Sequence, residues 1–272
     1  MRILRLLGVT LGFAAAALPM RASAQPLAPP DSATYVVFEY GTPVGNERSA
    51  FQNYGDSIVV SSETKRQFLD EKGGRHQYSK TMVLVVDARD LGLLRYVSGQ
   101  RLDGSTITRG LIPGDTAMTY YRELDGAGSA DRVVQPPGRL FVMDSQMFAL
   151  FDVLCRSLVG KRFTTRRVQM LALQPDSLAT PLATVTAAAE DTLQLGRLRI
   201  TARHYTLEDP SARFDLWADR QGRLLRLTHD PSGLRVERVP DQVVAPAAAR
   251  KRTPMRAKTS APPRRPAHGA GG

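Results

Sequence analysis

The hydrophobic pattern of the chain has a helical period in one long stretch, between residues 140 and 160. Apolar side chains recur there at steps of three and four residues, which is the spacing of one face of an α-helix. The repeating positions are Met147, Leu150, Phe151, Leu154 and Leu158, and Phe148 and Cys155 widen the stripe. The pattern therefore predicts a helix over 144–159 that is apolar on nearly all sides and needs a cover.

The polar residues of this stretch indicate how the helix would begin and end. Asp144 or Ser145 would cap its start by accepting hydrogen bonds from free backbone N–H groups. Gly160 would end it in a left-handed conformation. Asp152 and Arg156 are spaced to pair across one turn.

The rest of the body of the chain has short apolar or β-branched runs separated by turn signals, which is typical of strands. The turns at 220–222 and 231–233 are too short for crossover helices, so neighbouring strands should run antiparallel. Residues 125–138 read as a loop because they hold several Gly and Pro. The predicted strands are 33–40, 46–54, 57–69, 76–87, 93–101, 105–112, 116–124, 162–173, 182–193, 197–207, 212–219, 223–228 and 234–239.

The fold class that follows is mainly β. About a dozen antiparallel strands accumulate twist, so the sheet must curl into a half-barrel or clamp. The helix would pack on the concave side. The run Met82–Val86 is apolar at every position, which predicts a central strand that is covered on both faces.

The two ends of the chain read differently from its body. Residues 1–24 have the charged start, apolar run and small-residue cleavage site of a secretory signal peptide, with Ala22-Ser23-Ala24 at its end. No Cys follows that site, so a bacterial lipoprotein is not expected, and the protein should be periplasmic or secreted. Residues 25–32 would be a short linker, 33–240 a single β-rich domain, and 241–272 a disordered basic tail rich in Pro and Ala.

The net charge of +11 belongs mostly to these ends. Three of the 37 Lys and Arg lie in the signal peptide and seven in the tail, which leaves 27 against the 26 Asp and Glu that all lie from Asp31 to Asp241. A domain so close to neutral is not expected to bind nucleic acid. The tail would contact an anionic envelope surface, or have no partner.

Candidate reactive groups favour structural explanations. Cys155 is the lone cysteine and lies among apolar residues, which indicates a buried thiol. The four histidines do not have the spacing of a metal site, and no cofactor is implied; they are His76, His204, His229 and His268. Gly55-Asp56-Ser57 resembles an esterase block but suits a hairpin turn better.

Acidic residues leave a glycosidase open. Asp215, Asp219 and Glu39 are candidates by position, and Asp215 shares a strand face with Trp217, which would stack on a sugar. The alternative is that Trp217 packs in the fold while Asp215 pairs with a neighbouring Arg.

Three segments carry a family resemblance: 35–41 with Pro43-Val44-Gly45, the apolar helix that ends in 155–161, and the hairpin 214–227 with its single Trp. They resemble a bacterial periplasmic family of unknown function, similar in fold to Lol-type lipoprotein carriers. The resemblance implies a curved antiparallel sheet covered by a helix, and it supplies no catalytic residue.

These observations favour a binding protein without catalytic residues, in which a trough beneath the helix holds a lipid or other amphiphile. The residues expected to line it are Tyr35, Val37, Met82, Leu84, Met147, Phe148 and Phe151. One alternative is a structural or interaction module of the cell envelope without a ligand cavity. A second alternative is an envelope hydrolase.

Overall fold

The computed structural model describes residues 30–69, 73–174 and 177–240, and the predicted signal peptide and tail lie outside these ranges. The described residues up to Val239 belong to one compact unit. Its elements are β1 (Asp31–Glu39), β2 (Thr42–Asn53), β3 (Ser57–Leu69), β4 (Arg75–Asp87), β5 (Leu93–Leu102), β6 (Ser105–Ile112), β7 (Ala117–Leu124), β8 (Ala127–Val134), β9 (Leu140–Asp144), α1 (Ala149–Ser157), β10 (Thr165–Leu173), β11 (Leu178–Ala179), β12 (Leu182–Leu195), β13 (Leu198–Glu208), β14 (Arg213–Ala218), β15 (Leu224–His229), the 3₁₀ turn η1 (Asp230–Ser232) and β16 (Leu234–Arg238).

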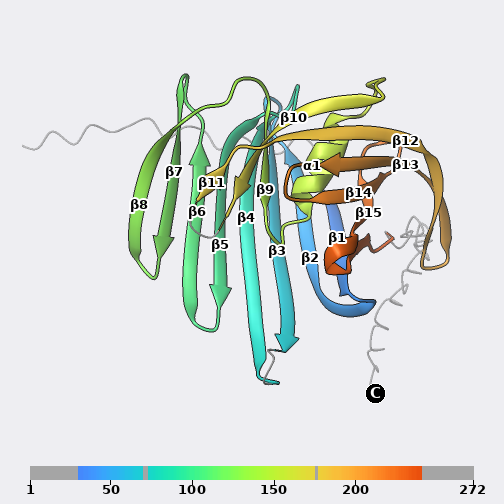
Figure 1. Cartoon of the computed structure of the whole chain (residues 1–272), viewed down its shortest axis with the longest axis horizontal. Helices are drawn as coiled ribbons and strands as arrows, with labels where there is room; N and C mark the ends of the chain where they lie inside the picture. Colours follow the sequence, from blue (N-terminus) through green and yellow to red (C-terminus); the bar gives the residue numbers. More distant parts are fainter. Residues whose placement is uncertain (1–29, 70–72, 175–176, 241–272) are drawn as a thin grey trace, which may run out of the picture. The chain divides into compact units, whose positions relative to one another are not determined.

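All sixteen strands of the described residues belong to one open, curved sheet (Figure 1). Consecutive strands from β1 to β8 form an antiparallel meander, and so do those from β12 to β16. The two meanders join where β16 pairs with β1, with Val37 opposite Val236. The predicted fold class, a large curved antiparallel sheet with one helix packed on it, is confirmed.

Thirteen strands coincide with predicted ranges, and β8, β9 and β11 are additional. The predicted loop over 125–138 is wrong, because Asp125 and Gly126 form a tight turn from β7 into β8. Both residues have positive φ, 48° and 88°, as a type I′ hairpin requires. Gly126, one of the Gly residues that suggested a loop, therefore forms a hairpin turn.

The central strand β4 is covered on one face only. Met82, Leu84 and Val86 are buried on the inner face, where α1 packs, whereas Val83 is 45 % exposed on the outer face. The predicted cover on both faces is wrong, because the described part of the chain contains a single α-helix and places it on the inner face.

The helix is shorter than predicted. Residues Leu140–Asp144 extend as β9, which pairs in parallel with β10, and the positive φ of Gln146 (66°) separates β9 from α1. Neither Asp144 nor Ser145 caps the helix, since α1 has no side-chain cap from its N-cap residue Phe148. Gly160 has the expected left-handed φ of 73°, three residues beyond the helix end.

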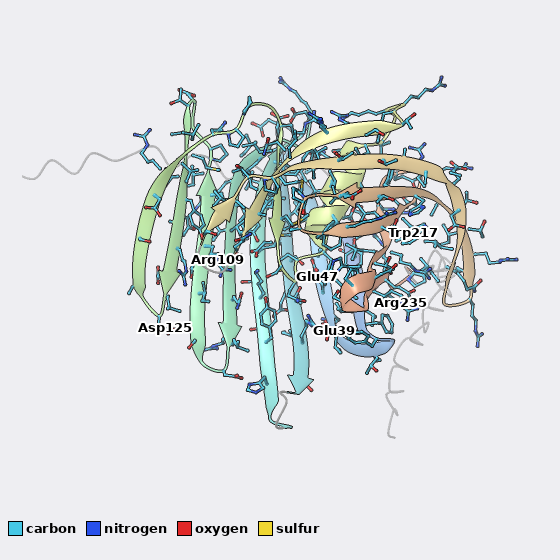
Figure 2. All side chains as sticks on the ribbon, viewed as in Figure 1. Glu39, Glu47, Arg109, Asp125, Trp217 and Arg235 are labelled. Atoms are coloured by element: carbon cyan, nitrogen blue, oxygen red, sulfur yellow. The ribbon has the colours of Figure 1, made fainter. Side chains whose placement is uncertain are left out.

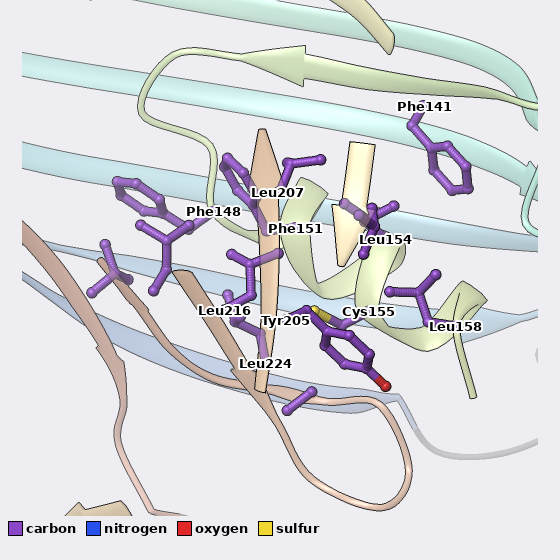
Figure 3. Close-up of a cluster of buried hydrophobic side chains, with 14 of the residues drawn as sticks. Phe141, Phe148, Phe151, Leu154, Cys155, Leu158, Tyr205, Leu207, Leu216 and Leu224 are labelled. Atoms are coloured by element: carbon purple, nitrogen blue, oxygen red, sulfur yellow. The ribbon is translucent and has the colours of Figure 1, made fainter. Parts of the chain in front are cut away.

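The helix separates two hydrophobic clusters. Phe151, Leu154 and Cys155 pack in one cluster with residues of β13 to β15, as Figure 3 shows. Leu150 and Val153 belong to a second cluster with residues of β3 to β7. Cys155 is fully buried as expected, and this burial raises the pKa of its thiol. One short helix therefore organises the packing of both halves of the sheet.

Candidate functional site

The seven residues predicted to line a trough are all buried, with at most 7 % of any of them exposed. The structure does not gather them around one space. Four belong to the cluster with Leu154 and three to the cluster with Leu150: Tyr35, Val37, Phe148 and Phe151 in the first, Met82, Leu84 and Met147 in the second. Side chains thus fill the space beneath α1, and ligand contact by these residues stays a prediction.

An apolar pocket of about 210 Å³ opens beside the helix rather than beneath it. Its walls come from β1, β2, β3, β4, the β4–β5 turn and α1. Three polar residues, Asp31, Asn53 and Arg156, also line the pocket. The apolar lining residues are Phe51, Ile58, Val60, Val86, Leu91 and Val153.

A second void, of about 10 Å³, adjoins this pocket. The two share Val86, Leu91 and Val153, and the void is otherwise lined by apolar residues of β4, β5, β9 and α1. Leu84 is the one predicted lining residue found here. Pocket and void together form a seam between α1 and the sheet, which we call the α1 seam.

A charge-balanced network lies where Asp31 and Arg156 line the seam. Arg156 donates to Asp152 Oδ1 at 2.7 Å and to Asp31 Oδ2 at 2.6 Å, so the predicted Asp152–Arg156 pair is confirmed. Arg238 lies 3.5 Å from Asp152 and 3.6 Å from Asp31. Two carboxylates thus face two guanidinium groups, and Arg156 also covers the ring of Phe51 at 4.1 Å.

Tyr35 fixes the buried end of this network. Its hydroxyl donates to Asp152 Oδ2 at 2.6 Å, and both side chains are fully buried. Burial and the negative charge of Asp152 raise the pKa of Tyr35 well above its ordinary value, so the phenol stays protonated as a donor. The helix is therefore tied to β1 and β16 by hydrogen bonds and charge.

A second polar cluster holds the start of the helix. Glu47 on β2 is fully buried and accepts from the backbone N–H groups of Phe148, at 2.5 Å, and Ala149, at 2.9 Å. Ser62 donates to the same carboxylate at 2.6 Å. Burial raises the pKa of Glu47, and these hydrogen bonds oppose the rise. Figure 2 labels Glu47 at its place in the sheet.

The strand that leads into the helix is held by Asp144. It accepts from Lys80 at 2.5 Å, Tyr96 at 2.7 Å and Ser98 at 3.0 Å, and both charged side chains are fully buried. Lys80 also donates to the carbonyl of Ser145 at 2.9 Å. Burial lowers the pKa of Lys80, and the charge of Asp144 opposes this.

Sequence reasoning did not find these two polar clusters. A weak signal for Lys80 was present, since it lies two residues before Met82 and so on the same, buried face of β4. Nothing in the local sequence of Glu47 indicates that it serves a helix 101 residues further along the chain.

The three acids considered for a glycosidase do not share a site. Asp215 contacts His204 at 2.8 Å and Thr206 at 3.0 Å, so the predicted pairing of Asp215 with a neighbouring Arg is wrong. Asp219 accepts from Arg223 at 2.6 Å, and Glu39 pairs with Arg66. Figure 2 shows Glu39 and Trp217 on separate parts of the sheet.

Trp217 is engaged within the fold. Its ring stacks on His204 with centroids 4.5 Å apart, and its indole N–H donates to Asp191 at 3.3 Å. It also packs against the small cluster of Leu193, Leu195, Ala202 and Leu225. The packing interpretation of Trp217 is therefore the one the structure supports.

The remaining candidates are the Gly55-Asp56-Ser57 block and the histidines. Gly55 and Asp56 lie in the tight turn between β2 and β3, where the Tyr54 N–H donates to the Ser57 carbonyl at 2.9 Å, which confirms the hairpin interpretation. Among the described residues, no three or more His, Cys, Asp or Glu side chains gather as metal ligands would. His268 lies outside them.

No protein-family model matches the sequence, and no curated protein matches it. Among solved structures, the chain is similar to a β-barrel-like protein of the domain of unknown function DUF1849 from Brucella abortus. The TM-score is 0.55 with 10 % identity, over 79 % of this chain and 97 % of that one. A DUF1089 family protein from Pseudomonas aeruginosa matches with a TM-score of 0.42 and 16 % identity, over 66 % of this chain and 87 % of that one.

The first of these similarities shows the fold alone, because the identity is low. It agrees with the expected β fold of a domain of unknown function. The likeness to Lol-type carriers stays a prediction. Within the described residues, α1 is too short to cross a membrane and no other α-helix is present.

Proposed function

We propose that this protein is a binding protein without catalytic residues that takes the end of an acyl chain, or a similar apolar group, into the α1 seam. The observation that carries the proposal is the pocket of about 210 Å³ with an apolar lining that continues into the smaller void. Apolar chains bind in such places because transfer out of water is favourable in proportion to the area buried.

The size of the seam limits what it accepts. It is smaller than the roughly 300–1,000 Å³ of a typical small-molecule pocket, so it suits part of a chain rather than a whole lipid. The headgroup would stay outside, near the end lined by Asp31 and Arg156.

The helix would stay in place during binding. Its start is held by Glu47 and its middle by Tyr35 and Arg156, so displacing it would leave buried charges without partners. The chain would therefore enter beside α1, and α1 would act as a fixed wall rather than a lid.

The expected compartment follows from the sequence. The signal-peptide pattern of residues 1–24 supports a location in the periplasm or outside the cell. By analogy with Lol-type carriers, the ligand would be a lipid or a lipidated partner. The basic residues after 241 would hold the protein at an anionic envelope surface.

Two neighbouring residues of β3 provide a matched test. Ile58 lines the pocket, while Val59 points to the opposite face because side chains alternate along a strand. We expect native mass spectrometry and calorimetry to detect binding of straight-chain fatty acids to the full chain. Ile58→Trp should fill the pocket and weaken binding at least about tenfold, whereas Val59→Trp should leave it unchanged.

The proposal fails if no fatty acid of any length binds the unmodified protein, or if the two Trp variants bind alike. Thermal unfolding of both variants controls for loss of structure. A bound chain that is lost only in Ile58→Trp supports the proposal.

A module without a ligand cavity is the second candidate, and the two filled clusters around α1 favour it. Under this function the envelope contact comes from the basic tail. Deletion of residues 243–272 should then release the protein from the envelope fraction, while fatty acids should not bind the full chain.

A further inference from the structure

A second, larger cleft lies away from α1, at one end of strands β2 to β5. Its volume is about 990 Å³, within the roughly 300–1,000 Å³ of ligand-binding pockets. Unlike the α1 seam, it has a polar lining with three cations. The lining residues are Pro43, Val44, Gly45, Asn46, Lys65, Arg66, Gln67, Gln77, Tyr78, Ser79, Arg101, Asp103 and Gly104.

Strand register places four of these residues in one row. Asn46 is opposite Lys65, Lys65 is opposite Ser79, and Ser79 is opposite Arg101. Directly opposed residues of antiparallel strands share a face, so an amide, a hydroxyl and two cations lie side by side across four strands. The row presents donors for both hydroxyl and acidic groups.

The two cations of this row are available to a ligand. Arg101 is exposed, and within the described residues no hydrogen bond or ion pair engages it. Lys65 pairs with Glu63 at 2.8 Å, but both side chains are largely exposed, 63 % and 45 %. Such a pair contributes little and exchanges readily for another anion.

A third cation, Arg66, follows Lys65 on β3, so its side chain points to the opposite face of the sheet from this row. Arg66 is only 8 % exposed, and its terminal nitrogens donate to Glu39 and Gln146. The only acid that lines the cleft, Asp103, is paired with His76. The cleft is therefore positive.

The spacing of the row argues for a ligand with separated charges. Lys65 and Arg101 lie two strands apart, which is about 10 Å at the usual spacing of strands. They present two positive positions with Ser79 between them, rather than one fork around a single ion. The amides of Asn46, Gln67 and Gln77, which line the cleft beside this pair of cations, suit hydroxyl groups.

From this arrangement we infer that the cleft binds an acidic polysaccharide, with its acidic groups on Lys65 and Arg101 and its hydroxyl groups on the amides and Ser79. This site is separate from the α1 seam and does not depend on the function proposed there. It uses the folded domain, whose overall charge is close to neutral, rather than the basic residues after 241.

Polygalacturonate oligosaccharides provide the acidic probe, and their methyl-esterified form provides the same chain without charge. Calorimetry with the full chain should show binding of the acidic form that weakens with added salt. The double variant Lys65→Gln/Arg101→Gln should bind about tenfold more weakly, the loss expected for two exposed charge contacts.

Arg95→Gln/Arg132→Gln is the matched control. Both arginines are exposed on the same sheet and do not line the cleft, and the change in net charge is the same. This control should bind within about twofold of the unmodified protein. An equal loss of affinity in the two double variants would overturn the inference. Affinity would then depend on net charge and on the basic residues after 241, not on the cleft.

Three further outcomes decide the same question. Absence of binding by the unmodified protein overturns the inference, as does equal binding of the methyl-esterified chain. Equal affinity for monomeric galacturonic acid overturns the two-charge arrangement on which it rests. An unchanged unfolding midpoint in both double variants shows that the loss reflects binding and not folding.

Discussion

Glu47 shows how a single residue of this protein can serve an element far from it in sequence. An acid within a strand ordinarily faces solvent, yet Glu47 is fully buried and accepts from the first backbone N–H groups of α1. These groups have no partner within a helix, and a carboxylate also suits the positive end of the helix dipole. Glu47 thus replaces the local cap that Asp144 or Ser145 was expected to supply.

Two substitutions of Glu47 should distinguish the contribution of its hydrogen bonds to stability from the contribution of its negative charge. Glu47→Leu leaves the two backbone donors of Phe148 and Ala149 unsatisfied in the interior and should lower the free energy of unfolding by about 3 kcal/mol. Glu47→Gln retains an acceptor oxygen for the backbone and can donate to Ser62, so it should lose less. Urea unfolding at neutral pH measures both.

The pH dependence of the same residue has a definite sign. Burial raises the pKa of Glu47 above its ordinary value of 4.5, so the folded protein takes up a proton at a pH where the unfolded chain does not. The stability of the unmodified protein relative to Glu47→Gln should therefore increase as the pH falls from the raised pKa towards 4.5. A relative loss over that range, measured by urea unfolding at several pH values, would contradict this assignment.

At the scale of elements, α1 depends on its neighbours. It has nine residues, and isolated helices of fewer than about 12–15 residues are marginal in water. Its end meets the turn between β14 and β15, where Gly222 has a φ of 79°. A Cβ on Gly222 would lie 2.7 Å from Arg156 Cα and 2.9 Å from the Cys155 carbonyl oxygen. Only glycine allows this approach of the turn to the helix.

Gly222→Ala should lower the free energy of unfolding by about 3 kcal/mol, since it combines an unfavourable left-handed φ with a clash against backbone. Gly196→Ala is the control, because Gly196 also has positive φ, 57°, but a Cβ there meets no atom within 4 Å. It should cost about 1 kcal/mol. Similar losses in both variants, measured by thermal unfolding, would show that the close approach contributes nothing.

At the scale of the whole described unit, the Lys80–Asp144 pair joins distant parts of the sheet. Lys80 is on β4, near the middle of the first meander, whereas Asp144 ends β9, which pairs with β10 beside the second meander. Because α1 also packs against both halves, the two hydrophobic clusters should unfold together.

Lys80→Met should therefore destabilise the entire unit. It leaves Asp144 charged and buried without its cation, a change that typically costs about 3–5 kcal/mol. Trp217 is the single tryptophan and lies on β14, in the other meander. Its fluorescence and the far-ultraviolet circular dichroism should shift to the same lower denaturant midpoint.

A second substitution tests the origin of that loss. Asp144→Asn in the Lys80→Met background removes the uncompensated charge and should restore part of the stability. If Trp217 fluorescence keeps the midpoint of the unmodified protein while the circular dichroism shifts, the two halves unfold separately.

The fold was largely predictable because most of its information is local. Turn residues and short β-branched runs marked thirteen strands, and the three- and four-residue period marked the residues of α1 that face its two clusters. The helix pair Asp152–Arg156 followed from spacing alone. Val83 was misjudged because apolar composition does not reveal whether a second layer covers the outer face.

The candidate site was predictable only in its residue types. Phe148, Phe151 and Met147 are buried as expected, but side chains fill the space beneath the helix and the pocket lies at its side. Neither the α1 seam nor the polar cleft has a sequence motif. Each is made of residues from several strands that approach one another only after the sheet curves.

The sequence by itself determined the class of the fold, the place of α1 and the nearly neutral charge of the domain, because each depends on residue type and short-range periodicity. Only the tertiary structure decided that Glu47 caps α1, that Lys80 neutralises Asp144 and that the cavities lie beside the helix and at the strand ends. Hydrogen bonds and ion pairs between residues about 60 to 120 positions apart depend on strand register, which no local pattern encodes.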